Sequence, residues 1–399
     1  MAAEIVKQKS RGFICVNSHP QGCRRNVATQ VEVVRAGLPA DLEGARNVLV
    51  IGASTGYGLA SRVAAAFGFG AKTLGICLDR PPDRGRTATA GYYNTAAFHE
   101  MARAEGLYAA SLNVDAFSDD AKRSAAEIIR RDMGKLDLVI YSVAAPKRVH
   151  PGTGQPFSSV LKPIGQPYHS RTIDLDSGRL TDVTLAPASE EEIADTVAVM
   201  GGEDWRFWMD MLAEENLLAP GARTLAYSYI GPELTWPVYR DGTIGRAKKD
   251  LEHTGKELNA VLEEKLGGQA WVAVNKAIVT QASAAIPVVP LYISILRRVM
   301  TEQRVEEGAI EQMRRLFFEY LAKGKTPATD TERRIRMDDR EMRPSVQKAA
   351  AEIWPRVTKE NLNDITDFAG FQNEFRGLFG FGVKGVDYTQ SVEVDITWE

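Results

Sequence analysis

The chain has 399 residues, of which 44% are hydrophobic and 25% are charged, so it can bury a core and is not generically disordered. A formal charge of −3 provides no overall basic field of the kind that attracts nucleic acid or an anionic membrane surface. We therefore expect a folded protein that binds neither of them and that meets any anionic ligand with local groups.

Cysteine usage and the apolar segments bear on the compartment. Three cysteines are an odd number and too few to cross-link a chain of this length, which favours a reducing cytoplasm. Cys15, His19 and Cys23 lie close enough to suggest a metal site, but no fourth ligand stands at a recognisable spacing, so we expect packed thiols and no metal. Residues 1–11 are polar and basic, unlike a signal peptide, and the most apolar stretch, 284–296, holds two prolines and is too short to span a bilayer. We expect a cytoplasmic protein without membrane insertion, in which that stretch is a buried wall.

An alternation of strands and helices starts near residue 47. Residues 48–51 form an apolar run, a glycine-rich turn follows, and residues 58–69 are small and apolar, as in a helix packed closely on a strand. The next expected elements, in chain order, are strands 73–78 and 108–114, helix 119–132 and strand 136–142. Four parallel strands in series predict an α/β fold with a Rossmann-type doubly wound parallel sheet.

An insertion interrupts this alternation. Residues 146–188 are rich in Pro, Gly, Ser and Thr without a helical period, which predicts an inserted hairpin or lid. Ser189 and Glu192 then form a capping box that opens a helix to about residue 200, and a second helix is expected at 203–218. We expect these two helices, 189–218, to border the substrate.

The alternation resumes after the insertion. Its elements are expected at strand 223–230, helix 243–265 and strand 270–279. The pattern is helical and charged from 290 to 325, and the tail ends with a possible strand at 392–396. We expect one body made of three parts: an N-terminal extension at 1–45, the Rossmann core at 46–300, and a C-terminal helical and tail region at 301–399.

The first strand is followed by a turn suited to phosphate. Such a turn needs glycines where the backbone bends and a helix N-terminus whose free N–H groups face the charge. Gly52, Gly56 and Gly58 meet that need with a G-x3-G-x-G spacing, which resembles the fingerprint of the short-chain dehydrogenase/reductase superfamily. The alternative, a glycine-rich turn without a ligand, is disfavoured because a strand precedes the turn and a helix follows it.

The end of the second strand bears on the choice of cofactor. Asp79 stands about 20 residues past the glycine turn, where a carboxylate can accept hydrogen bonds from the adenosine ribose, so NADH is favoured. Arg80 and Arg84 could instead neutralise the 2′-phosphate of NADPH, which is the less favoured cofactor, or could be solvated surface residues. Weaker signals come from the ends of the third and fourth strands, which meet the adenine and the nicotinamide ribose in such sheets: Asp115, Ala116, Val143 and Ala144.

The strongest chemical signal is the pair Tyr239 and Lys248. Nine positions on one helix would turn the two side chains to opposite faces, so we expect Tyr239 to precede the helix, with Gly242 at the bend and Thr243 as N-cap. A tyrosine becomes an acid near neutral pH when a cation stabilises its phenolate, and we expect Lys248 to lower its pKa in this way. The alternative is a packed tyrosine beside an exposed lysine, which would be the better interpretation without the cofactor turn upstream.

Several motifs together resemble one family. These are VLVIGASTGYG at 48–58, VMGGEDW at 199–205, YSYIG at 227–231 and the Tyr-x8-Lys pair. The combination resembles the trans-2-enoyl-CoA reductase and enoyl-acyl-carrier-protein reductase family, whose Tyr-x8-Lys spacing is longer than that of its better-known relatives. The similarity extends from residues 11–15 to 286–292, whereas the tail beyond Lys323 is less familiar.

The resemblance implies NADH-dependent reduction of the C2=C3 double bond of a trans-2-enoyl thioester, carried by coenzyme A or by acyl carrier protein, in fatty acid synthesis. It implies that Tyr239 is the proton donor, that Tyr229 contacts the thioester carbonyl and that Lys248 holds the nicotinamide ribose. It assigns the following residues to the cofactor, together with Lys248: Gly52, Ala53, Ser54, Thr55, Gly56, Tyr57, Leu78, Asp79, Asp115, Ala116, Val143, Ala144, Ala277, Ile278, Val279 and Thr280.

Other consequences concern the acyl chain, flavin and assembly. Trp205, Trp208 and the wall at 284–296 are candidate acyl-chain surfaces, although for any one aromatic a core position is the better interpretation. The family has been labelled with a flavin-binding domain, but the sequence has no second dinucleotide turn, so we expect no flavin. We expect a monomer, because the lid, the Tyr-Lys segment and the cofactor turn can belong to one body.

Two alternatives use the same residues differently. A carbonyl reductase of the wider superfamily would also use Tyr and Lys beside NADH to reduce a ketone. A non-catalytic NAD(H)-sensing protein would keep the cofactor fold, but it is not expected to carry the paired Tyr239 and Lys248. The sequence leaves open the acyl carrier, the acyl length and the physiological direction.

Overall fold

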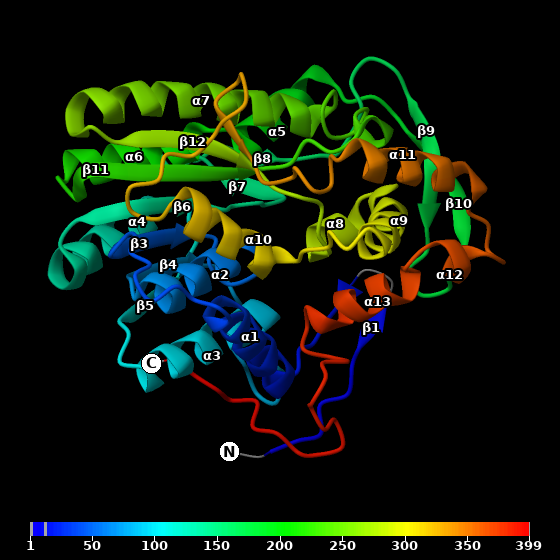
Figure 1. Ribbon diagram of the computed structural model, residues 1–399, viewed down its shortest axis with the longest axis horizontal. Helices are drawn as coiled ribbons and strands as arrows, with labels where there is room; N and C mark the ends of the chain where they lie inside the picture. The colour runs from blue at the N-terminus through cyan, green and yellow to red at the C-terminus, as the bar shows by residue number, and fades with distance from the viewer. Residues whose placement is uncertain (1–2, 12–13, 399) are drawn as a thin grey trace.

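The computed structural model describes residues 3–11 and 14–398, and a seven-stranded sheet lies at its centre (Figure 1). All its strands run parallel, in the order β13-β12-β11-β6-β3-β4-β5. They are β3 (Asn47–Ile51), β4 (Lys72–Cys77), β5 (Ala109–Asn113), β6 (Leu136–Tyr141), β11 (Leu218–Ser228), β12 (Gln269–Val274) and β13 (Arg334–Arg336). The chain moves outward from β3 to β5 and then returns to β6, so the order reverses between β3 and β6, where ligands bind in such sheets. The predicted Rossmann-type fold is confirmed.

The sheet is covered on both faces because its strands are apolar on both sides. In β3, Val48 and Val50 belong to one buried cluster, whereas Leu49 and Ile51 belong to another. Four helices contribute to the first cluster: α1 (Pro20–Arg35), α2 (Gly56–Val63), α3 (Ala90–Ala104) and α10 (Ala309–Arg315). Three contribute to the second: α4 (Asp119–Ile128), α6 (Glu203–Glu214) and α7 (Thr243–Leu266).

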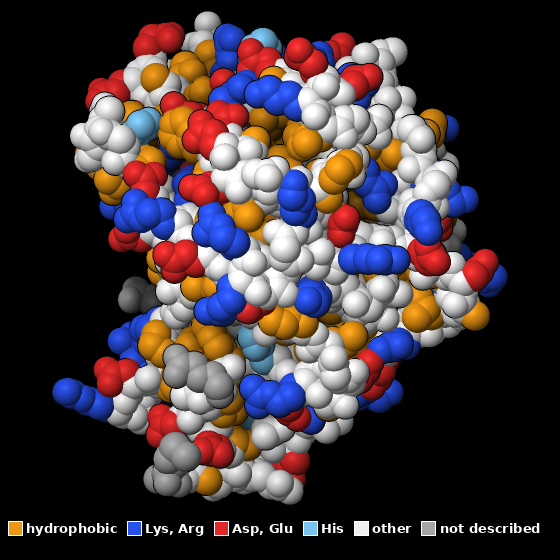
Figure 2. Space-filling view, turned by 90° about the vertical axis from the view of Figure 1, so that its left-hand side faces the viewer, with side chains coloured by type: hydrophobic (Ala, Val, Ile, Leu, Met, Phe, Trp, Pro, Cys, Tyr) orange, Lys and Arg blue, Asp and Glu red, His pale blue; other side chains and the backbone are white. Residues whose placement is uncertain are grey.

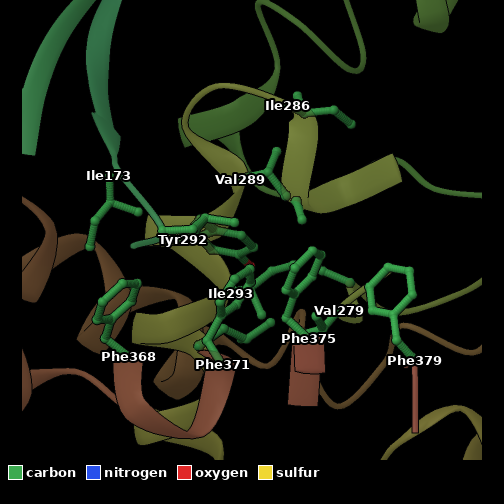
Figure 3. Close-up of a cluster of buried hydrophobic side chains, with 14 of the residues drawn as sticks. Ile173, Val279, Ile286, Val289, Tyr292, Ile293, Phe368, Phe371, Phe375 and Phe379 are labelled. Atoms are coloured by element: carbon green, nitrogen blue, oxygen red, sulfur yellow. The ribbon is translucent and has the colours of Figure 1, made fainter. Parts of the chain in front are cut away.

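A second group of helices lies beside the carboxyl ends of β11 and β12, on the right of Figure 1. It comprises α8 (Gln281–Ala285), α9 (Val289–Glu302), α11 (Pro344–Ile353), α12 (Leu362–Ile365) and α13 (Phe368–Gly377). Figure 3 shows Tyr292 and Ile293 of α9 against Phe371 and Phe375 of α13, with Ile173 beside them. The stretch 284–296 therefore forms the buried wall that its composition predicts.

The insertion forms two hairpins instead of one. β7 (Lys147–Val149) pairs with β8 (Pro156–Ser158), and β9 (Tyr168–Ile173) pairs with β10 (Leu180–Leu185), both antiparallel. The helix after it, α5 (Glu190–Met200), begins with the predicted capping box of Ser189 and Glu192.

The two ends of the chain lie together. The short strands β1 (Ser10–Arg11) and β2 (Ile14–Cys15) precede α1, and Glu4 forms a single bridge with Val392. The predicted strand at 392–396 is wrong, because beyond that bridge the tail runs along α3. There the hydroxyl of Tyr93 donates to the carbonyl oxygen of Val394 at 2.8 Å, which satisfies the backbone without a ladder.

Other boundaries also differ from the predictions. The strand expected at 270–279 ends at Val274, because the next residues form the loop that leads to α8. The helical stretch expected at 290–325 is broken between α9 and α10, where Arg304 has a positive φ of 57°. Helix α3 and strand β13 were not predicted.

The surface charges, the search for membrane-spanning helices and the N-terminal thiols bear on the predictions about membranes and metals. Figure 2 shows one face, on which basic and acidic side chains are interspersed. None of the helices in the described part of the chain is long and apolar enough to cross a membrane. Cys15 and Cys23 are buried free thiols, and His19 caps α1 through Nδ1. Within residues 3–11 and 14–398, no group of three or more His, Cys, Asp or Glu side chains could hold a metal ion.

Candidate active site

The glycine-rich turn joins β3 to α2 where the strand order reverses. Gly52 has a φ of +85°, and a Cβ atom there would lie 2.1 Å from the carbonyl oxygen of Ser142. A Cβ atom on Gly58 would lie 1.8 Å from the carbonyl oxygen of Gly52, so only glycine allows this approach. The N-cap residue Thr55 makes no side-chain bond to α2, which leaves the first N–H groups of the helix free. The turn therefore fits the pyrophosphate of a dinucleotide.

Asp79 lies just past the end of β4. One carboxylate oxygen of Asp79 accepts a hydrogen bond from the hydroxyl of Thr89 at 2.8 Å, and the other is buried without a partner among the described residues. Its backbone is held by the side chain of Asn113, with bonds of 2.7 and 2.8 Å. A buried acceptor without a partner is expected to receive a donor from a ligand, and the ribose hydroxyls of a dinucleotide would supply it. β4 ends at Cys77, one residue earlier than predicted, and Leu78 is exposed.

The two neighbouring arginines are placed differently. The side chain of Arg84 is 95% exposed and lies 3.8 Å from the carboxylate of Asp83, which is the solvated position considered above. Arg80 is half-buried, and one of its guanidinium nitrogens has no partner among the described residues.

The remaining strand ends lie at the same edge of the sheet. The carboxylate of Asp115 accepts the backbone N–H of Phe117 at 3.0 Å, and the carbonyl oxygen of Ala116 accepts the indole N–H of Trp208 at 3.1 Å. Val143 is half-buried and Ala144 is exposed, directly after β6. Because carboxyl ends of parallel strands share one edge, all four predicted residues lie on the side of the sheet that carries the glycine turn.

The tryptophans are core residues. Trp205 and Trp208 are both 0% exposed and pack in the cluster between the sheet and helices α4, α6 and α7. The indole N–H of Trp205 donates to the hydroxyl of Thr224 at 2.9 Å. They are therefore core side chains and not an acyl-chain surface. From the sequence, a core position is the better interpretation for each of them.

Tyr239 precedes α7, as the spacing predicted. Its backbone N–H donates to the carbonyl oxygen of Thr235 at 3.0 Å, within a turn that packs on the start of the helix. Close packing here requires glycine, since a Cβ atom on Gly245 would lie 1.9 Å from the carbonyl oxygen of Arg240. The N-cap is Gly242, and not Thr243 as predicted, because the Thr243 hydroxyl instead donates to a carbonyl of the insertion.

The insertion is attached to this segment. Thr243 exchanges hydrogen bonds with Lys162, and the hydroxyl of Tyr168 donates to the carbonyl oxygen of Leu234 at 2.9 Å. A displacement of the hairpins would therefore also move the turn that carries Tyr239.

Tyr229 and Tyr239 lie together. Their rings pack edge to face with centroids 4.9 Å apart, and both are half-buried. The ammonium group of Lys248 lies 3.4 Å from the carbonyl oxygen of Tyr227, which is on the strand that leads to Tyr229. The neighbouring Lys249 is exposed. The structure thus brings the two predicted hydroxyl donors into contact and holds Lys248 against the strand that leads to Tyr229.

The pKa of Tyr239 shifts in the direction opposite to the expected one. Burial raises the pKa of the Tyr239 phenol, and the negative charge of Glu341 raises it further. The expected lowering of this pKa by Lys248 is therefore wrong, and Tyr239 is held as a neutral O–H donor. Burial lowers the pKa of Lys248 to about 8, and Glu252 opposes that shift.

Glu341 was not predicted. It is 0% exposed, and it lies in the turn between β13 and α11. Its Oε1 accepts the hydroxyl of Tyr229 at 3.1 Å and the hydroxyl of Tyr292 at 2.7 Å. Its Oε2 accepts the backbone N–H of Ala277 at 2.7 Å. Burial raises the pKa of this carboxyl, while the Tyr292 hydroxyl, the Ala277 N–H and the charge of Lys276 lower it.

The loop after β12 carries the last predicted cofactor residues. The side chains of Ala277 and Val279 are buried, whereas Ile278 and Thr280 are half-buried, and Thr280 caps α8. Two further residues at this edge, Ser228 and Asn275, were not predicted. In the described chain, the side-chain oxygen of Ser228 and both polar side-chain atoms of Asn275 are buried without partners. These residues end β11 and enter the loop after β12, so they present polar groups at the same sheet edge.

Family models match most of the chain. The family described as "NAD(P)H binding domain of trans-2-enoyl-CoA reductase" matches residues 5–84, and "Trans-2-enoyl-CoA reductase catalytic region" matches residues 86–322. A third, "Enoyl reductase FAD binding domain", matches residues 329–392. The similarity therefore extends into the tail that the motifs left unassigned.

Curated relatives match nearly the full length of the chain. A protein of Opitutus terrae named enoyl-acyl-carrier-protein reductase (NADH) is 56% identical over 393 residues, with 98% of this chain and 99% of the relative covered. A Coxiella burnetii protein of the same name is 53% identical over 392 residues, covering 98% of this chain and 96% of the relative.

Solved structures match the complete fold. Clostridium acetobutulicum trans-2-enoyl-CoA reductase in complex with NADH superposes with a TM-score of 0.95 at 41% identity, over 99% of each chain. The Treponema denticola enzyme in complex with NAD gives a TM-score of 0.93 at 46% identity, again over 99% of each chain. The chain therefore belongs to the trans-2-enoyl-CoA reductase family, which its motifs resemble.

Proposed function

We propose that the protein is an NADH-dependent enoyl reductase that saturates the C2=C3 double bond of trans-2-enoyl thioesters in fatty acid synthesis. The observation that carries the proposal is the contact of Tyr229 with Tyr239 at the carboxyl edge of the sheet that holds the dinucleotide turn. Supporting it are full-length relatives named enoyl-acyl-carrier-protein reductase (NADH) and similar structures of trans-2-enoyl-CoA reductases with NADH and NAD.

The residues that would hold the cofactor lie along the carboxyl edge of the sheet. When NADH is bound, the free N–H groups of α2 would hold its pyrophosphate, the second carboxylate oxygen of Asp79 would accept from the adenosine ribose, and Lys248 would donate to the nicotinamide ribose. The contacts proposed from the resemblance extend along residues 52–57, 78–79, 115–116, 143–144 and 277–280. NADH supplies the hydride to the β-carbon of the substrate when it is bound.

The tyrosines act on the other end of the substrate. Addition of hydride at the β-carbon leaves negative charge on the thioester oxygen, and a preorganised hydroxyl aimed at that oxygen stabilises it. Tyr229 contacts the thioester carbonyl, and Tyr239 delivers the proton that completes the saturation. In the described chain the hydroxyl of Tyr239 has no hydrogen-bond partner, which leaves it available to the substrate.

We propose that NADH is preferred over NADPH and that no flavin takes part. The side chain of Arg84 points into solvent, whereas Asp79 offers the buried acceptor, so the 2′-hydroxyl is the better fit. In the region 329–392, the aromatic residues Phe368, Phe371 and Phe375 pack into the hydrophobic core and are not free to stack on a flavin ring (Figure 3). Purified protein without flavin fluorescence that reduces crotonyl-CoA at full rate supports this, and a rate that depends on added flavin contradicts it.

The test of the function is the loss of NADH absorbance with crotonyl-CoA, with crotonyl-acyl-carrier-protein and with a simple ketone. The two thioesters are expected to be reduced and the ketone to be ignored. Faster turnover of the ketone would instead show a carbonyl reductase, and binding of NADH without turnover would show a sensing protein. The ratio of the two thioester rates identifies the acyl carrier.

We propose that the protein acts as a monomer in the cytoplasm. The insertion bonds directly to the turn that carries Tyr239, and the three cysteines are free thiols, as in a reducing compartment. Sedimentation at the assay concentration measures the active species. A monomer that is inactive until it dimerises would contradict the proposal.

A further inference from the structure

The buried carboxyl of Glu341 joins two parts of the proposed site. Its Oε1 bonds the hydroxyl of Tyr229, and its Oε2 bonds the backbone N–H of Ala277. Tyr229 follows β11, and Ala277 is in the loop that follows β12. One side chain therefore spans the ends of two adjacent strands.

Hydrogen bonds, and not an ion pair, hold the buried Glu341. A buried carboxyl is costly without such partners, and no ion pair involves Glu341 in the residues that the structure describes, so its bonds to Tyr229, Tyr292 and Ala277 are what fix it. The ammonium of nearby Lys276 is bonded to the carbonyl oxygen of Ala277. By contrast Glu307, which is also buried, pairs with Arg315 at 2.8 Å. Glu341 is the buried glutamate whose partners belong to the proposed catalytic site.

The position of Glu341 is itself fixed by a further residue. The side-chain N–H of Gln347, on α11, donates to the backbone carbonyl of Glu341 at 2.7 Å and to the hydroxyl of Tyr292 at 3.2 Å. Tyr292, on α9, donates in turn to the Glu341 carboxyl. Such supporting bonds hold a side chain in one rotamer, which is what a group that orients another residue requires.

We infer that Glu341 is a positioning residue of the reduction: it fixes the Tyr229 hydroxyl relative to the loop at Ala277, and so aligns the substrate side of the site with the cofactor side. The inference rests on the roles proposed above for Tyr229 and for residues 277–280. It also gives the C-terminal region, from which Glu341 comes, a part in the active site.

Substitutions at Glu341 are expected to act through alignment. A displacement of about 1 Å at a reacting group can cost about 10²-fold in rate, so Glu341→Ala is expected to lower kcat by roughly 10- to 100-fold. Glu341→Gln keeps the shape and can bond to either partner, so it is expected to recover a large part of that loss. Glu307→Gln is the matched control: it breaks a buried ion pair that bonds neither Tyr229 nor Ala277, and it is expected to lower the melting temperature while kcat stays within a few-fold.

A double-mutant cycle on kcat tests the inference, with saturating NADH and crotonyl-CoA and with the melting temperature measured for every variant. If Glu341 acts through Tyr229, the Tyr229→Phe/Glu341→Ala double variant is expected to be hardly slower than the slower single variant. Where Glu341→Ala does not fold, Glu341→Gln takes its place in the same cycle.

The outcomes separate this inference from the proposal on which it rests. A Tyr229→Phe variant with the wild-type kcat would contradict the role of Tyr229 itself, and the inference would fall with it. A slow Tyr229→Phe variant whose loss simply multiplies with that of Glu341→Ala would leave the role of Tyr229 standing and overturn the inference. A wild-type kcat in Glu341→Ala would also overturn it.

Discussion

The ring of Tyr229 meets the ring of Tyr239 edge to face, at 84° and with centroids 4.9 Å apart. Only one of the two hydroxyls is bonded to another side chain of the described protein: Tyr229 donates to Glu341. In the described protein the hydroxyl of Tyr239 has no such bond, and the raised pKa of this phenol keeps its proton in place near neutral pH. These surroundings suit the different tasks proposed for the two tyrosines, orienting the thioester for Tyr229 and donating the proton for Tyr239.

Replacing Tyr239 with Phe removes only the hydroxyl, so NADH binding is expected to persist while turnover falls by roughly 10²- to 10⁴-fold, as for a lost general acid. Stopped-flow or steady-state rates with crotonyl-CoA measure turnover, and the fluorescence of bound NADH measures affinity. A Tyr239→Phe enzyme that keeps most of its rate would make Tyr229 the leading donor.

Lys248 is expected to set an alkaline limit to the use of NADH. The ammonium is present below its pKa of about 8 and is lost as the pH rises through that value, so kcat/KM for NADH is expected to decline above about pH 8. Lys248→Arg keeps the charge to higher pH and is expected to remove this decline, at the cost of a lower maximum. Lys249→Ala, on the exposed neighbouring residue, serves as the control and is expected to keep the wild-type profile. An unchanged decline in Lys248→Arg would assign it to another group.

Asp79 is expected to determine the choice between NADH and NADPH. Asp79→Ala removes the buried acceptor for the ribose and a negative charge near the 2′-phosphate, so the preference for NADH should narrow. Asp83→Ala is a matched control, because that carboxylate is exposed and, among the described residues, pairs only with the solvated Arg84. The measurement is the ratio of kcat/KM values for the two cofactors. Equal narrowing in both variants would show a general charge effect and remove the specific role of Asp79.

The predictions from sequence succeeded where a short segment carries its own signal. The apolar runs and glycines at 48–58 define a strand, a turn and a helix within eleven residues, so the sheet and its dinucleotide turn follow from local periodicity. The position of Tyr239 before α7 also follows locally, because nine positions on one helix would turn Tyr239 and Lys248 to opposite faces and Gly242 allows the bend.

The predictions failed where distant segments decide the structure. Glu341 is 112 residues from Tyr229, and no local pattern links them. β13 is only three residues long, too short for a period of two, and it forms because β12 leaves an edge to pair with. The pKa of Tyr239 was expected to fall because the sequence shows Lys248 nearby. The sequence does not show that Tyr239 is buried close to the carboxyl of Glu341, and both of these raise the pKa.

Gly245 offers a way to move Tyr239 without changing it. A Cβ atom at position 245 would lie 1.9 Å from the carbonyl oxygen of Arg240 and 2.7 Å from that of Tyr239, so Gly245→Ala must push the tyrosine turn away from α7. Because a misplacement of about 1 Å can cost about 10²-fold in rate, kcat is expected to fall by roughly that factor while NADH affinity changes little.

Gly267 at the other end of the same helix is the control for this change. It has a φ of +63° with open space around its Cβ position, so Gly267→Ala strains the backbone by about 1–2 kcal/mol without touching the site. Both variants are therefore expected to melt at lower temperature, but only Gly245→Ala should lose kcat when assayed well below its melting point. Equal kcat values in the two variants would show that the turn before α7 does not position the proton donor.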